Sequence, residues 1–230
     1  MFFDWTFIIL IPSIILTLFA QAKVRGNLSK FSRIGTRNGK TGADIAKSIL
    51  SSAGIRDVNV EMLRSDNGDH YDPSSRTIRL SANNFQSSSI TAVAVAAHEA
   101  GHAIQHNESY TPLSFRSGFF PVARFGSVLA WPMIIIGIFL ASMGEFSMIF
   151  IHLGIILFTV TVIFHLVTLP VEFNASRRAT EILEAGYYLT DEELRGAKKV
   201  LNAAALTYVA AAAAVISQLL RLLLIFGRRQ

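Results

Sequence analysis

Long apolar runs constrain this chain more than any other feature of its sequence. Four segments, residues 2–20, 127–143, 146–169 and 200–226, are nearly free of charge, and a helical membrane span needs about 20 apolar residues. Charged residues make up only 16% of the chain, against roughly a quarter in typical soluble domains. The sequence therefore predicts an α-helical membrane protein with about four transmembrane helices.

The first apolar segment allows two interpretations. Ala20-Gln21-Ala22 resembles the cleavage site of a signal peptide, but the apolar stretch carries Asp4 where a positive charge is expected. We expect residues 1–20 to be a retained anchor, with a cleaved signal as the alternative. Residues 127–169 should form a transmembrane hairpin, and residues 200–230 a C-terminal membrane helix.

Two polar stretches, 21–126 and 170–199, lie between the spans and hold eighteen of the 21 lysine and arginine residues. Two crossings separate these stretches, so both face the same side, which their positive charge predicts to be the cytoplasm. Arg228 and Arg229 fit this topology less well, because a fourth crossing would put them outside. We expect the protein to lie in the cell membrane. A lysine- and arginine-rich membrane face explains the net charge of +5, so a nucleic-acid partner is not expected.

The first polar stretch contains signals for a helix and two strands. Thr41 and Asp44 resemble a capping box that begins a helix. Residues 58–63 and 77–80 have strand composition, and the turn residues 66–69 lie between them. The sequence predicts a small β-hairpin or sheet in this cytoplasm-facing region. We expect strand 77–80 to be a sheet edge that could pair with an extended substrate.

Further capping signals predict three more helices. Serines 87–89 offer N-caps for a helix over 90–105. Pro170 suits the first turn of a helix over 170–185. Thr190 with Glu193 is a capping box that begins the last helix.

The five residues His98-Glu99-Ala100-Gly101-His102 carry the strongest chemical signal. Positions i and i+4 share one face of a helix, so both imidazoles can bind one zinc ion. Glu99 beside them can take a proton from a zinc-activated water. The alternative is that the two histidines form hydrogen bonds with neighbouring groups and that Glu99 is a surface charge. That alternative gives no reason for two histidines and a carboxylate in an otherwise apolar helix, where unpaired polar groups are costly.

A catalytic zinc ion takes three protein ligands, and without cysteine the third must be His, Asp or Glu. Glu172 is the preferred candidate, because it follows the third span directly, at the start of a helix that can pack against the His98 helix. Its alternative role is to complement the dipole of that helix. Glu181 and Glu184 are the reserve candidates.

Three other residues have weaker signals. His70 and Tyr71 could polarise a substrate carbonyl or stabilise an oxyanion, or they could simply pack beside a strand. His165 precedes Glu172 by seven residues, and an ionisable group in a membrane span is a functional candidate. A polar packing contact is the alternative for His165.

Residues 98–102, the membrane hairpin and the segment 171–178 resemble the YugP-type family of bacterial membrane zinc metallopeptidases. The resemblance extends to residues 70–73 and covers most of the chain. It implies a gluzincin-like zinc-protease core, similar in plan to the HtpX and CAAX prenyl proteases. In the wider glutamate-ligand group, an aspartate four residues after the ligand supports a zinc-bound histidine, and Ser176 occupies that place here.

We therefore expect a membrane-bound zinc metallopeptidase that hydrolyses peptide bonds with Glu99 as the general base. The expected partners are one zinc ion, the lipid bilayer, and peptide or protein substrates, membrane proteins among them; the sequence carries no signal for an oligomeric state. One rival is a site-2-like intramembrane protease, whose motif would lie inside a span. The other is a non-enzymatic membrane scaffold with a structural metal, which would use four protein ligands.

Overall fold

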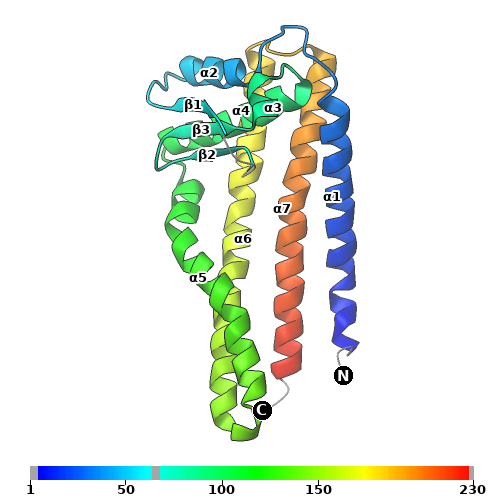
Figure 1. The fold of residues 1–230 in the computed structure, drawn as a ribbon, viewed down its shortest axis with the longest axis vertical. Helices are drawn as coiled ribbons and strands as arrows, with labels where there is room; N and C mark the ends of the chain where they lie inside the picture. Colours follow the sequence, from blue (N-terminus) through cyan, green and yellow to red (C-terminus); the bar gives the residue numbers. More distant parts are fainter. Residues whose placement is uncertain (1–4, 64–67, 228–230) are drawn as a thin grey trace. The chain divides into compact units, whose positions relative to one another are not determined.

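The computed structural model describes residues 5–63 and 68–227, and most of them are helical (Figure 1). The elements are η1 (Trp5–Ile9), α1 (Ile11–Phe31), α2 (Gly42–Ser52), β1 (Asn59–Met62), β2 (His70–Asp72), β3 (Thr77–Leu80), α3 (Ala82–Gln86), α4 (Ile90–Asn107), α5 (Thr111–Phe139), η2 (Ala141–Met143), α6 (Glu145–Ala185) and α7 (Asp191–Phe226). The predicted class, a helical protein with a small sheet, is confirmed.

The chain divides into two compact units. The membrane unit comprises residues 1–19, 115–169 and 207–230, and the site unit comprises residues 20–114 and 170–206. Four helical segments of the described chain are long and apolar enough to cross a membrane: Trp5–Phe31, Thr111–Phe139, Glu145–Ala185 and Asp191–Phe226. This confirms the expected number of candidate spans.

Small residues let α5 and α6 pack closely within the membrane unit. A Cβ atom on Gly126 of α5 would lie 2.8 Å from the carbonyl oxygen of Leu157, and one on Gly154 of α6 would lie 2.8 Å from that of Ala130. Glycine at such crossings is typical of helices that associate in lipid. Large apolar side chains such as Ile149 remain exposed on this unit, as contact with lipid requires.

The helix α6 runs without interruption from Glu145 to Ala185 and contains Pro170. The expectation that Pro170 begins a separate helix is therefore wrong. A proline removes one backbone donor, but a membrane helix tolerates it where neighbouring groups satisfy the freed carbonyl. The third apolar segment and the predicted third-ligand helix are one element. Similarly, α5 begins at Thr111, sixteen residues before the predicted second span.

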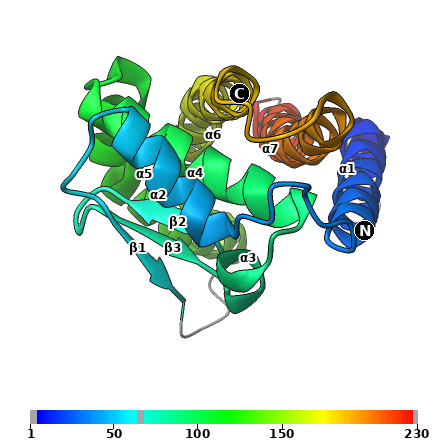
Figure 2. The same ribbon diagram turned by 90° about the horizontal axis from the view of Figure 1, so that it is seen from above.

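The sheet has the order β1-β3-β2, with β1 parallel and β2 antiparallel to β3. Helices α2 and α4 lie on one face of it (Figure 2). Strand β3 is therefore central, and the expectation that it is a free edge is wrong. Of the two predicted forms, hairpin or sheet, the structure has the sheet: β1 and β3 pair in parallel, and β2 supplies the antiparallel partner. Residues 66 and 67 of the expected turn lie outside the described residues.

The core of the site unit forms where α2 and α4 meet the sheet. Ile78 and Leu80 of β3 are fully buried, as are Ile45 and Ile49 of α2. The predicted capping box of Thr41 is present and fixes the start of α2. This core holds α4 against the sheet.

Asp72 organises the turn between β2 and β3. Its carboxylate accepts hydrogen bonds from the hydroxyls of Ser74 and Ser75 and from Arg79. The serine hydroxyls, followed by Arg79, hold the pKa of Asp72 well below its ordinary value, although burial opposes them. The charged carboxylate therefore stabilises the turn above about pH 4, near the ordinary value for aspartate.

We expect Asp72→Asn to lower the free energy of unfolding by about 1–2 kcal/mol at neutral pH, because hydrogen bonds to a charged group are the stronger ones. The contribution of the charged Asp72 carboxylate to stability is lost as the pH falls from about 4 through the lowered pKa of this group. The difference in Tm between wild type and variant, measured in detergent, should therefore narrow below about pH 4. A constant difference from pH 7 down to about pH 3 would contradict this role for the charge.

Candidate metal centre

The helix α4 carries both histidines of the five-residue motif. Ser89 caps its first turn by accepting a hydrogen bond from the backbone N–H of Ala92. Small alanine side chains along α4 are fully buried, so the middle of this helix sits deep in the site unit. The rings of His98 and His102 lie edge to face with centroids 4.7 Å apart.

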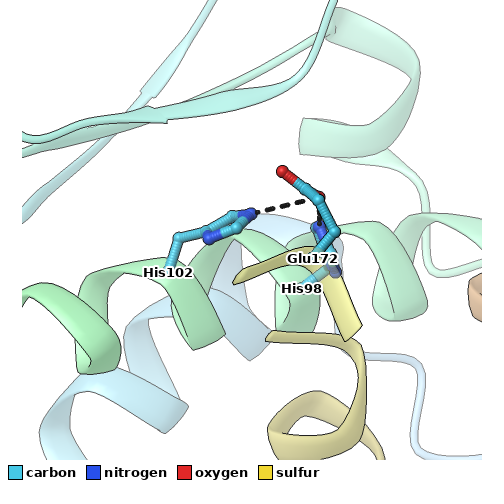
Figure 3. Close-up of side chains that lie close together, drawn as sticks. All are labelled: His98, His102 and Glu172. Atoms are coloured by element: carbon cyan, nitrogen blue, oxygen red, sulfur yellow. Dashed lines mark hydrogen bonds and ion pairs between the residues drawn. The ribbon is translucent and has the colours of Figure 1, made fainter. Parts of the chain in front are cut away.

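Glu172 of α6 completes a cluster with the two imidazoles (Figure 3). Its Oε2 atom lies 3.2 Å from Nε2 of His98 and 3.6 Å from Nε2 of His102. Two ligands of a tetrahedral zinc ion with bonds of roughly 2.0–2.1 Å stand about 3.3 Å apart. The two distances bracket that value, and the carboxylate side chain is only 3% exposed, so these residues fit a zinc ion.

Gly101, between the two histidines, lets α6 approach α4. A Cβ atom at this position would lie 2.8 Å from the carbonyl oxygen of Ala175, closer than a carbon atom can approach without displacing the backbone. Ala175 is one turn from Glu172 on α6. The contact between the two backbones therefore brings the carboxylate to the imidazoles.

Glu99 lies next to this cluster and is 7% exposed. Burial raises the pKa of its carboxyl group above the ordinary value. The His98 ring opposes this rise, the negative charges of Glu172 and Asp69 add to it, and a hydrogen bond from the backbone N–H of Tyr71 opposes it. A raised pKa makes a carboxylate a better proton acceptor near neutral pH.

Each imidazole also makes a hydrogen bond through its Nδ1 atom. The hydroxyl of Ser176 lies 3.2 Å from Nδ1 of His98, at the place where the family resemblance suggested a supporting residue. Oε1 of Gln105 lies 2.9 Å from Nδ1 of His102. These contacts direct both Nε2 atoms toward Glu172.

The remaining candidate residues lie in different surroundings. Tyr71 and His70 belong to strand β2. The Tyr71 hydroxyl lies 2.7 Å from Nδ1 of His106, and Nδ1 of His70 lies 3.0 Å from the carbonyl oxygen of Gly68. Burial, followed by the nearby charge of Asp72, raises the pKa of Tyr71 to about 12. Both residues remain candidates without an assigned role.

The reserve ligands and His165 do not join the cluster. Glu181 and Glu184 are largely exposed and form ion pairs with Arg177 and Lys198. His165 is half-buried in the membrane unit. In the described chain, the group of donors that could hold a metal is His98, His102 and Glu172.

The sequence interpretation missed Gln105, which is fully buried beside His102. The available signal was its spacing of three residues from His102, a candidate ligand on the same helix, since such positions are neighbours on the helix surface.

Two comparisons with known proteins bear on this site. The profile of the family described as "Putative neutral zinc metallopeptidase" matches residues 6–227. The chain is also 46% identical, over 211 residues, to the "Putative membrane protease YugP" of Bacillus subtilis (strain 168), with 92% of each chain covered. No solved structure matches.

Proposed function

This chain belongs to the neutral zinc metallopeptidase family, and from that premise we propose that it is a membrane-bound protease that hydrolyses peptide bonds. The observation that carries the proposal is the buried cluster of two imidazoles and one carboxylate with Glu99 beside it. His98, His102 and Glu172 would hold the zinc ion. Glu99 would act as the general base.

Zinc bound at such a site lowers the pKa of a water molecule and polarises a carbonyl group. Glu99 takes a proton from the attacking water and later delivers it to the leaving amine. The backbone N–H of Tyr71 donates to the Glu99 carboxylate and so orients it for both transfers. Burial of the site keeps competing water away from these groups.

Two features favour this function over its rivals. Three donors leave a coordination position for water, whereas structural zinc sites use four protein ligands; the cluster in the described chain has three. The helix α4 is not among the candidate spans of the described residues. A motif outside the spans argues against an intramembrane protease of the site-2 kind.

The position of Glu172 favours substrates that are cleaved near the membrane surface. It lies three residues after Leu169, the end of the apolar segment, on the continuous helix α6. At a rise of 1.5 Å per residue this separation is about 5 Å. We place the site on the cytoplasmic side, because the polar stretches that contain it carry most of the basic residues.

The sheet offers an edge for an extended substrate at β2 rather than at the central β3. Among the described residues, strand β2 has β3 as its one neighbour in the sheet, and it packs against α4. Strand addition to a free edge aligns a peptide through backbone hydrogen bonds. We therefore place the substrate chain along β2.

Removal of the metal tests the proposed function. We expect a chelator to abolish cleavage of an unfolded model protein in detergent, and stoichiometric zinc to restore it. The hydrophobic core of the site unit does not include the metal, so the metal-free protein should keep its circular dichroism spectrum. Unfolding on metal removal, with no cleavage by the zinc-loaded protein, would instead support a structural metal site.

A further inference from the structure

Gln105 makes three hydrogen bonds from a fully buried position between α4 and α6. Its Oε1 atom lies 2.9 Å from Nδ1 of His102. Its Nε2 atom donates to the backbone carbonyl of Val171 and to Oδ1 of Asn174, each at 2.9 Å. The amide therefore contacts one proposed metal ligand directly and the residue that precedes another.

These partners leave one orientation for the Gln105 amide. A backbone carbonyl can only accept a hydrogen bond, so the atom that faces Val171 must be the NH₂ group. The orientation of the Asn174 amide is fixed independently, because Nε of Arg178 can only donate and lies 2.7 Å from Oδ1 of Asn174. The Asn174 oxygen thus also requires a donor from Gln105, and Oε1 of Gln105 must face His102.

The orientation of the amide determines which nitrogen of His102 carries the proton. An amide oxygen only accepts, so Nδ1 must be the protonated nitrogen. Nε2, which faces Glu172 at 3.6 Å, is then the nitrogen whose lone pair can bind a metal. A hydrogen bond to the outer nitrogen of a ligand histidine fixes its ring and raises its basicity.

The support of His98 is different in kind. The hydroxyl of Ser176, 3.2 Å from its Nδ1 atom, can donate as well as accept. It therefore does not select one protonated nitrogen. Gln105 therefore determines which nitrogen of His102 is protonated, whereas Ser176 holds the His98 ring without doing so.

We propose that Gln105 is a positioning residue of the metal centre: it keeps Nε2 of His102 free for the metal and ties this ring to the backbone that carries Glu172. The inference rests on the proposed zinc site, because it assumes that His102 binds the ion. It assigns two separate roles to the two ends of one amide. The oxygen prepares the ligand, and the nitrogen joins α4 to α6.

Two substitutions separate these roles. Gln105→Leu removes both ends of the amide, whereas Gln105→Glu keeps an acceptor for His102 and loses the donors to Val171 and Asn174. We expect both variants to lower the Tm of the metal-free protein. Zinc affinity, measured by competition with a chelator, should fall about 10–100-fold in Gln105→Leu and stay within about threefold of wild type in Gln105→Glu.

The matched control is Ser176→Ala, which removes the hydroxyl beside His98 and should weaken zinc binding less than Gln105→Leu does. A purely structural Gln105 predicts that zinc affinity follows Tm in both Gln105 variants, and that result would overturn the inference. If wild type itself binds no zinc, the proposed metal site fails instead.

A measurement on the wild-type protein needs no variant to fold. In zinc-loaded protein with isotope-labelled histidine, NMR should show a slowly exchanging proton on Nδ1 of His102, identified by cross-relaxation with the Gln105 side chain. A proton on Nε2 of that ring would overturn the proposal. Agreement with the expected proton and with the two affinities would establish it.

Discussion

Replacing Glu99 with glutamine should reduce peptide hydrolysis by about 10²–10⁴-fold, the usual contribution of a general base, while zinc stays bound. The two side chains have nearly the same shape, so the substitution should fit the buried position of Glu99. The amide oxygen can still accept the hydrogen bond from the backbone N–H of Tyr71. What the variant lacks is a group that can accept a proton from water.

The experiment compares zinc content, Tm and cleavage of an unfolded model protein for wild type, Glu99→Gln and Glu181→Gln. Glu181 undergoes the same chemical change on a side chain that is 59% exposed, and this control should cleave at the wild-type rate. Loss of zinc from Glu99→Gln would mean that Glu99 has a ligand role. Undiminished cleavage by that variant would exclude it as the base.

The second large effect is expected at Glu172. Glu172→Gln removes the negative charge of the third donor, and an amide oxygen is a poor ligand for zinc beside two imidazoles. Zinc affinity should fall by more than the roughly 10–100-fold that is typical for residues that only support a ligand. Activity should fall with it at limiting zinc.

The same control variant distinguishes the candidate ligands on α6. Glu181→Gln should retain wild-type zinc affinity, because Glu181 pairs with Arg177 and lies outside the cluster. If Glu181→Gln loses zinc and Glu172→Gln retains it, the assignment of the third ligand is wrong. If both retain it, the metal has a different set of donors.

The parts of the fold that depend on local chemistry could be predicted from the sequence. Ser89 caps α4, and the capping residues Thr190 and Glu193 exchange hydrogen bonds at the start of α7. The long apolar stretches likewise predict the candidate spans, because the length and composition of a segment decide whether its helix can cross a bilayer. The place of Glu172 directly after a span predicts it as the third donor, and the structure brings it to the two histidines.

The errors concern pairings between distant segments. Strand β2 has only three residues, too few to show an alternating pattern. The sequence therefore suggests an antiparallel hairpin of the two longer strands, whereas these strands pair in parallel. Pro170 suggests a helix start because proline favours that position, but α6 continues through it. Gln105 was missed because its partners Val171 and Asn174 lie more than 60 positions away in the sequence.

The contact between Gly101 and Ala175 has a consequence for how the five-residue motif is defined. The pattern specifies two histidines and a glutamate and leaves the two residues between Glu99 and His102 open. In this protein the second of these, Gly101, occupies a place where even a methyl group would push against a main-chain oxygen. The identity of a residue that the pattern leaves unspecified therefore helps to determine whether a carboxylate from another part of the chain can reach the two histidines.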